Sequence, residues 1–321
     1  MRRPNGFERW ELAPRALPEM DLRDVDTRVT FLGHRLNVPI IIASMTGGTA
    51  EATHINRNLA RAAQALGAAM AVGSQRIMLE NSRMTKSFTC IRDIAPKMLV
   101  YGNLGAAQLN EGFNAADVQR ACEAMGADGM FLHLNALQEA IQAEGNTNFG
   151  HLVDQIGAVV REVPFPILVK EVGCGIDAHS ARALASVGVA AIDVSGAGGT
   201  SWARIEGLRA TDPRRARMGA VFGEWGTPTA VALRDCRRAL PVHPLIASGG
   251  IRNGLEAAKA LAMGANMVAL AGPLLKAAQQ SADAVIAALD ALMAELRVAM
   301  FASGARDVAS LAARPLRRVH G

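Results

Sequence analysis

The strongest constraint on the fold is a repeated alternation of short apolar runs with amphipathic segments. Eight runs have the length and composition of buried parallel strands, and segments with helical periodicity lie between them. This alternation predicts an α/β fold with a parallel sheet covered by helices. Eight units favour a closed (β/α)₈ TIM barrel over an open doubly wound sheet, which is the alternative. The runs are Pro39–Ser44, Ala69–Ser74, Met98–Asn103, Met130–Asn135, Ile167–Glu171, Ala190–Ser195, Pro244–Ser248 and Met267–Ala271.

The chain length of 321 residues suits one barrel with insertions. We expect residues 1–37 to form a short N-terminal extension and residues 38–321 to form a single barrel domain. The connection from Ser195 to Pro244 is too long for one helix, which indicates an excursion at the active site. The segment after Leu274 is expected to form the closing helix, running toward Met300.

Charge and composition exclude several kinds of partner. The net charge is +5, but the two arginine clusters lack the interleaved aromatic residues of a nucleic-acid site, so no nucleic-acid partner is expected. No apolar run approaches the roughly 20 residues of a membrane helix, so no membrane partner is expected either. Four cysteines without a C-x-x-C pair favour reduced thiols and a cytoplasmic location. The arginine clusters are Arg214, Arg215 and Arg217, and Arg314, Arg317 and Arg318.

Polar or glycine residues end all eight apolar runs. In a barrel of this class the C-terminal strand ends and the loops after them form the active site. A packed core alone would not place polar groups at every one of these positions. The eight ends are Ser44-Met45-Thr46-Gly47-Gly48, Gly73-Ser74-Gln75-Arg76, Gly102-Asn103-Leu104-Gly105, His133-Leu134-Asn135, Lys170-Glu171-Val172-Gly173, Asp193-Val194-Ser195-Gly196, Ser248-Gly249-Gly250-Ile251-Arg252 and Ala271-Gly272.

The seventh and eighth ends predict a phosphate site. Gly249, Gly250 and Gly272 allow backbone N–H groups to approach an anion, and Arg252 adds a positive charge. A pair of tight turns is the alternative interpretation.

Lys170 ends an otherwise apolar strand, where an unpaired ammonium is costly, so an anionic partner is expected. A reduced flavin, which carries negative charge, fits this position. A salt bridge with Asp193 or Glu171 is the alternative.

A polar group follows the fourth run. His133 and Asn135 share one face of the strand, and Gln138 and Glu139 come shortly after. A single carboxylate such as Glu139 can help to bind Mg²⁺ against a diphosphate. The alternatives are a structural histidine and a glutamate that complements a helix dipole.

Taken together and in order, these motifs resemble those of the type 2 isopentenyl-diphosphate isomerases, the FMN-dependent kind, from about Glu19 to Pro315. Three further motifs add to the resemblance: Gly198-Gly199-Thr200, Leu137-Gln138-Glu139 and Phe222-Gly223-Glu224-Trp225-Gly226.

The resemblance implies FMN, NADPH and Mg²⁺ as cofactors, with Mg²⁺ at Glu139. It implies substrate contacts from Ser74, Gln75, Arg76, His133, Asn135 and Gln138, among which Gln138 and His133, together with Lys170, take catalytic roles. The FMN-binding residues that it implies are Ser44, Met45, Thr46, Ser74, Asn103, Lys170, Ser195, Thr200, Gly250, Ile251, Arg252, Ala271 and Gly272.

The family interconverts isopentenyl and dimethylallyl diphosphates by adding one proton and removing another, with the flavin reduced by NADPH. The resemblance also implies a homo-oligomer, a tetramer or octamer. The family's N-terminal Arg-Lys-x-x-His-like motif is not found before Phe7. Either an upstream start codon would restore it, which is our hypothesis, or this form binds the substrate weakly. Three rival functions stay open: an FMN-dependent 2-hydroxy-acid oxidase, a flavin-binding form with impaired catalysis, and a barrel scaffold without a cofactor. The first normally carries a His-Gly-Gly run, whereas His243 here precedes its strand.

Overall fold

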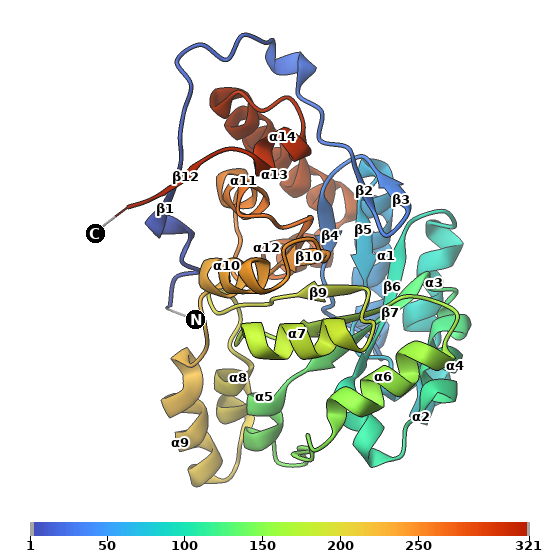
Figure 1. Ribbon diagram of the computed structural model, residues 1–321. Helices are drawn as coiled ribbons and strands as arrows, with labels where there is room; N and C mark the ends of the chain where they lie inside the picture. The colour runs from blue at the N-terminus through green and yellow to red at the C-terminus, as the bar shows by residue number, and fades with distance from the viewer. Residues whose placement is uncertain (1–2, 320–321) are drawn as a thin grey trace.

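A closed barrel of eight parallel strands forms the centre of the molecule, of which the computed structural model describes residues 3–319 (Figure 1). Each strand pairs with the next one in the chain, and the last, β11, pairs with β4. The closed barrel is thereby confirmed and the open doubly wound sheet is wrong. The strands are β4 (Ile40–Ile42), β5 (Ala69–Ala71), β6 (Val100–Gly105), β7 (Gly129–Leu134), β8 (Ile167–Glu171), β9 (Ala191–Asp193), β10 (Leu245–Ala247) and β11 (Met267–Leu270).

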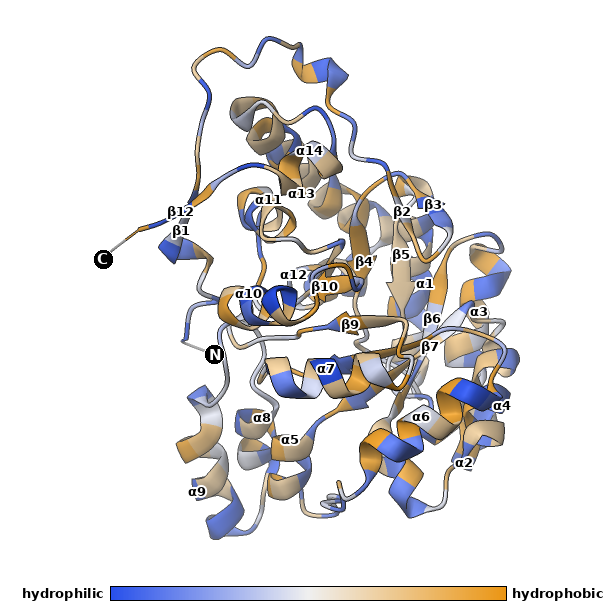
Figure 2. Cartoon of the chain, in the orientation of Figure 1, coloured by the Kyte–Doolittle hydropathy of each residue, from blue (hydrophilic) through white to orange (hydrophobic). Residues whose placement is uncertain are grey.

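The two faces of each strand bury different cores, as the period of two in a strand requires. In β4, Ile41 points into the barrel, whereas Ile40 and Ile42 pack against the helices. The strands are accordingly apolar along both faces, whereas helices such as α6 and α10 are apolar on one side and hydrophilic on the other (Figure 2). Burial of each such isoleucine contributes roughly 1.5–3 kcal/mol.

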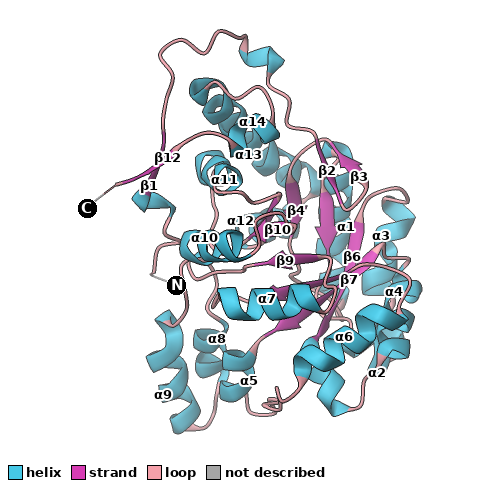
Figure 3. Cartoon of the chain, viewed as in Figure 1, coloured by secondary structure: helices cyan, strands magenta, loops and turns pink. Residues whose placement is uncertain are grey.

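Helices follow the strands and cover the barrel (Figure 3). Local signals set their ends. Before the first residue of α4, the Asn114 side chain accepts from the backbone N–H of Ala116, and after its last residue comes Gly126, with a φ of 64°. The helices are α1 (Ala50–Leu66), α2 (Arg76–Glu80), α3 (Lys86–Ile94), α4 (Ala115–Met125), α5 (Ala136–Ile141), α6 (Leu152–Glu162), α7 (Ala178–Ser186), α8 (Trp202–Arg209), α9 (Pro213–Val221), α10 (Thr229–Ala239), α11 (Gly254–Ala262), α12 (Gly272–Gln280), α13 (Ala282–Ser303) and α14 (Val308–Ala312), with short 3₁₀ turns η1 (Phe7–Arg9), η2 (Leu22–Asp24), η3 (Ser82–Met84), η4 (Ala106–Glu111) and η5 (Phe222–Glu224).

Two regions between or after the strands bear on the sequence expectations. The predicted excursion after Ser195 contains α8, α9 and η5, and α8, α9 and α5 project beyond one end of the barrel (Figure 1). The prediction of a single closing helix after Leu274 is wrong, because the segment forms two helices, α12 and α13. Ser281 has an extended φ of −165° and its side chain accepts from the backbone N–H of Ala284, which starts a new helix there.

The N-terminal residues wrap around the barrel. Strand β1 (Trp10–Leu12) pairs with β12 (Leu316–Arg318), which brings the two ends of the described chain together. The hairpin of β2 (Val29–Phe31) and β3 (His34–Leu36) places Phe31 and Leu36 against the interior residues of the barrel. It therefore closes the end opposite the polar strand tips. None of the helices in residues 3–319 combines the length and the apolar composition that a membrane span requires.

Candidate active site

The inward-facing residues near the C-terminal strand ends form a polar layer over the apolar barrel interior. The layer consists of Asn103, His133, Lys170, Asp193 and Ser248. In the strand register His133 lies beside Lys170, and Lys170 beside Asp193. The Ser248 hydroxyl donates to Asp193 Oδ1 over 2.7 Å, and His133 Nδ1 lies 3.1 Å from Asn103 Oδ1. Neighbouring strand ends thus bring together residues from five different β–α units.

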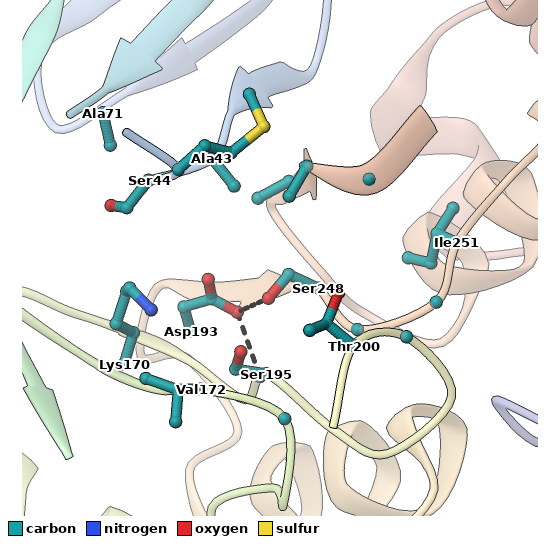
Figure 4. A pocket seen from close by; sticks show the side chains of 18 of the residues that line it. Ala43, Ser44, Ala71, Lys170, Val172, Asp193, Ser195, Thr200, Ser248 and Ile251 are labelled. Atoms are coloured by element: carbon teal, nitrogen blue, oxygen red, sulfur yellow. Dashed lines mark hydrogen bonds between the residues drawn. The ribbon is translucent and has the colours of Figure 1, made fainter. Parts of the chain in front are cut away.

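The first of two cavities above this layer has a volume of about 720 Å³ and is bounded by the tips of β4, β8, β9, β10 and β11. Figure 4 shows Lys170, Asp193 and Ser248 along one side, with Ser44 opposite. The predicted cofactor residues that line it are Ser44, Met45, Thr46, Lys170, Ser195, Thr200, Gly250, Ile251, Arg252, Ala271 and Gly272.

The Lys170 ammonium faces this cavity without a carboxylate partner. Its Nζ donates to the carbonyl of Glu171 over 3.1 Å, and in the described part of the chain it forms no ion pair. Burial lowers the pKa of Lys170, and the charge of Asp193 opposes that shift. The Glu171 carboxylate instead accepts from the backbone N–H groups of residues 172–175. The predicted alternative, a salt bridge, is therefore wrong, and the positive charge is open to an anion.

Backbone N–H groups of the seventh loop also face the cavity. The N–H groups of Gly249, Gly250 and Ile251 have no acceptor among the described residues. A β-carbon on Gly249 would lie 2.0 Å from the carbonyl oxygen of Gly196, and one on Gly250 would lie 2.3 Å from Gly198. Their φ angles are +104° and +77°, which glycine alone adopts at little cost. Three unpaired N–H groups in a concave loop are typical of an anion site.

Arg252 lines the same cavity, but its guanidinium is occupied by backbone. Nη1 donates to the carbonyl of Gly250 and Nη2 to that of Gly198, each over 2.7 Å. The side chain therefore joins the sixth and seventh loops in addition to supplying positive charge. Ser195, at the tip of β9, has a φ of +39°, a strained conformation for a residue with a side chain.

The second cavity, of about 730 Å³, adjoins the first and shares Met45, Thr46 and Leu275 with it. Its lining has more residues with charged or amide side chains than that of the first cavity. It collects five of the six predicted substrate contacts and the predicted metal ligand, which are Ser74, Arg76, His133, Asn135, Gln138 and Glu139. Ser74 lines only this second cavity, not the first.

The Glu139 carboxylate is held on both oxygens. Asn135 Nδ2 donates to Oε1 and the backbone N–H of Asn146 donates to Oε2, each over 2.6 Å. Asn135 Oδ1 is buried without a hydrogen-bond partner in the described chain. No cluster of three or more potential ligands from His, Cys, Asp and Glu occurs among the described residues. One carboxylate beside an unused amide oxygen suits Mg²⁺ only if phosphate oxygens and water complete its shell.

His133 is held as a neutral imidazole. Burial and the nearby charge of Lys170 lower the pKa of His133 to about 3. The contact is with the side-chain oxygen of Asn103, which can only accept, so it favours the tautomer with the proton on Nδ1. Nε2 is then an acceptor rather than an acid.

Two predicted site residues lie outside both cavities. Gln75 is fully buried, its Nε2 donates to the carbonyl of Ala121, and its Oε1 accepts from the backbone of Asn103. These bonds use its amide to join β5 to β6 and α4, so it is not available to a substrate. Asn103 is buried and reaches the site only through His133.

Glu206 and Asp193 are site residues that the sequence did not assign. Glu206, on α8, is 9% exposed and accepts from Gln138 Nε2 over 2.9 Å, which gives that amide a carboxylate neighbour. The search for polar residues at strand ends could not find Glu206, because α8 lies within the long connection between Ser195 and Pro244. The sequence named Asp193 at a strand end and as a possible partner of Lys170, but gave it no role of its own in the site.

Comparison with known proteins agrees with this architecture. The sequence matches the FMN-dependent dehydrogenase family over residues 2–86 and 105–318. Among solved structures, lactate oxidase of Pediococcus acidilactici is similar with a TM-score of 0.75 and 20% identity, covering 98% of this chain and 85% of that one. A mandelate oxidase mutant has a TM-score of 0.69 at 20% identity, covering 98% and 90%. These two likenesses concern the fold.

The chain belongs to the FMN-dependent dehydrogenase family of TIM-barrel proteins. It is 50% identical to the isopentenyl-diphosphate delta-isomerase of a Synechococcus species over 306 residues, 95% of this chain and 88% of the relative. It is 49% identical to the enzyme of that name from Deinococcus radiodurans over 298 residues, 92% and 86% of the two chains. Within the larger class, the chain is therefore a member of the type 2 isopentenyl-diphosphate delta-isomerase family.

Proposed function

We propose that this protein interconverts isopentenyl diphosphate and dimethylallyl diphosphate, with FMN in the first cavity and the diphosphate in the second. The observation that carries the proposal is the pair of adjoining cavities with different linings. One offers unpaired backbone N–H groups and a buried ammonium. The other offers Arg76, Gln138 and Glu139.

The first cavity has groups that suit FMN. The N–H groups of Gly249, Gly250 and Ile251, with Gly272 at the start of α12, would bind its phosphate. Lys170 would lie beside the part of the ring that becomes negative on reduction. The Ser44 hydroxyl is buried without a partner among the described residues and could accept or donate to the ring edge. When bound and reduced by NADPH, FMN would supply the acid–base chemistry next to the alkene.

The second cavity has groups that suit a diphosphate. Arg76 would bind phosphate oxygens, and Glu139 would help to bind Mg²⁺ against them. His133, as a neutral acceptor, would orient a water on the metal or the substrate.

The reaction moves a double bond without net oxidation. A proton is added to the terminal methylene, the intermediate has tertiary carbocation character, and a proton leaves C2. Gln138, whose Nε2 donates to Glu206 Oε1, would position the substrate for both proton transfers, because an amide on its own is a poor acid and a poor base. With substrate bound, the site would have to exclude water, which would otherwise trap the cation.

Three further expectations belong to this proposal. We expect a homo-oligomer, a tetramer or octamer, and residues 1–37 acting as an extension of one barrel domain over residues 38–321. We also expect a cytoplasmic location, which the four free cysteines support.

The test is an anaerobic assay of the purified protein with isopentenyl diphosphate, FMN, NADPH and Mg²⁺. We expect dimethylallyl diphosphate to form only when the flavin is reduced. Turnover of lactate or glycolate, with no isomerisation, would instead support the rival 2-hydroxy-acid oxidase.

A further inference from the structure

The N-terminal strap, defined here as residues 3–7, lies against the seventh loop. Asn5 is 2% exposed, and its Nδ2 donates to the carbonyl of Gly250 over 2.8 Å. Its Oδ1 accepts from the backbone of Phe7 over 3.1 Å, and its backbone carbonyl accepts from Ala230 over 3.0 Å. Phe7 itself is fully buried. The strap is therefore packed against the barrel, and the Asn5 side-chain amide is its contact with the seventh loop.

The strap also contacts the sixth loop closely. A β-carbon on Gly198 would lie 2.5 Å from Cβ of Asn5, so Asn5 fills the space beside that glycine. Arg252 joins Gly198 to Gly250 from the other direction. Asn5 and Arg252 thus both donate to the carbonyl oxygen of Gly250.

Fixing a carbonyl also fixes the N–H on the same peptide. In a planar trans peptide the C=O and the following N–H point in opposite directions. The bond from Asn5 to the Gly250 carbonyl therefore sets the direction of the Ile251 N–H. The Thr229 hydroxyl, which donates to the Gly249 carbonyl over 2.5 Å, does the same for the Gly250 N–H. Both N–H groups are among those that have no acceptor in the described chain.

We propose that Asn5 is a positioning residue for the cofactor phosphate, acting through the Gly250–Ile251 peptide. This inference rests on the proposed function only in placing FMN in the first cavity. It predicts a defect specific to the phosphate. The isoalloxazine ring would still meet Lys170 and Ser44, which Asn5 does not contact.

The test compares two flavins that differ only in the phosphate. Apoprotein with Asn5→Ala is titrated with FMN and with riboflavin, and the dissociation constants are read from flavin fluorescence. We expect the FMN constant to rise about 10-fold and the riboflavin constant to stay within about 2-fold of wild type, since one charge-assisted hydrogen bond is misdirected. Equal changes for both flavins, or no change, would overturn the proposal.

Two further variants separate positioning from folding. Phe7→Leu disturbs the strap without altering the Gly250 bond, so it should lower the melting temperature and keep the wild-type ratio of the two constants. Asn5→Asp keeps the acceptor for Phe7 but loses the donor, so it should weaken FMN more than Asn5→Ala does and spare riboflavin. A wild-type protein that binds FMN no better than riboflavin would overturn the inference. One that prefers FMN but does not isomerise would contradict only the proposed function.

Discussion

The two cavities lie side by side but are built from different parts of the chain. The first is bounded by the tips of β4, β8, β9, β10 and β11, and its lining includes six glycines, whereas the lining of the second includes Arg76 of α2, His133 of β7 and Glu139 of α5. Backbone cannot be altered by changing one side chain, except where a β-carbon has no room. A cavity lined by side chains can be changed one contact at a time. Substitutions should therefore affect the two cavities differently. In the first a single substitution should abolish ligand binding, whereas in the second each substitution should lower the affinity by a part.

The largest effect is expected from Gly250→Ala. The new β-carbon would lie 2.3 Å from backbone atoms of Gly198, so the loop must move and its N–H groups with it. We expect FMN affinity to fall more than roughly 100-fold, because several hydrogen bonds to the phosphate are lost together. Fluorescence titration of the apoprotein measures it.

Gly33→Ala is the matched control for Gly250→Ala. Gly33 has a φ of +85°, but a β-carbon there would meet nothing within 4 Å. It shares the backbone strain, about 1 kcal/mol, without the collision. FMN binding should be unchanged in Gly33→Ala. If it were also normal in Gly250→Ala, the seventh loop would not be the site of the FMN phosphate.

Lys170→Met should separate the redox states of the cofactor. Because Lys170 has no carboxylate partner, its charge is available to the reduced, anionic ring. We expect reduced FMN to bind roughly 100-fold more weakly and oxidised FMN to be affected less, with isomerisation lost. The flavin potential should become more negative, which spectroelectrochemistry measures. Lys276→Met, on exposed α12, is the control and should change neither. A potential equal to wild type in Lys170→Met would remove this role.

Asp193→Asn tests the polar layer that underlies the first cavity. Burial raises the pKa of Asp193 to about 6, although the charge of Lys170 opposes the shift. The folded protein thus keeps a proton that the unfolded chain loses above about pH 4. The stability from that carboxyl is complete below pH 4 and is lost as the pH rises through 6. Asparagine does not titrate, so the variant does not lose this stability as the pH rises. Its free energy of unfolding relative to that of wild type should therefore increase by on the order of 2 kcal/mol between pH 4.5 and 7.5.

Urea unfolding of the apoprotein at each pH measures the effect of Asp193→Asn. Asp26→Asn serves as a control of opposite sign, because Arg28 lowers the pKa of Asp26 to about 2. Its stability relative to wild type should fall as the pH rises from about 2 to about 4, and the difference should then stay constant up to pH 7.5. Parallel pH profiles for Asp193→Asn and wild type would show that Asp193 does not titrate in this range.

The smallest effect is expected in the second cavity, from Glu139→Gln. The amide keeps the shape of the side chain but removes the charge that faces Mg²⁺. We expect the Mg²⁺ concentration for half-maximal activity to rise about 10-fold, with FMN affinity unchanged. Glu144→Gln, on the exposed loop after α5, should leave the Mg²⁺ requirement as it is. Weaker FMN binding in Glu139→Gln would break the separation of the two cavities.

The sequence was sufficient to predict the barrel, and it named many of the residues that line the two cavities, because an apolar run that ends in polar residues can be recognised without a structure. It predicted Lys170 and Gly250 at one cavity and Glu139 at the other. It was insufficient for side-chain direction. Gln75 directly follows a strand end, as Lys170 ends one, yet its amide turns into the wall and bonds to Ala121 and Asn103.

Contacts between distant segments were also invisible to the sequence. Glu206 reaches Gln138 only because the α8 helix folds back beside α5, a contact across 68 residues. Asn5 reaches Gly250 across 245 residues. Neither contact follows a periodic pattern, since each depends on how loops and the N-terminal segment pack against the finished barrel.

A crystal structure of the protein with reduced FMN, Mg²⁺ and isopentenyl diphosphate tests the central claim most directly. The account predicts the FMN phosphate at the N–H groups of residues 249–251 and the diphosphate near Arg76 and Glu139, with the alkene between them at Met45 and Thr46. A diphosphate bound at the seventh loop, or an FMN phosphate in the second cavity, would contradict it.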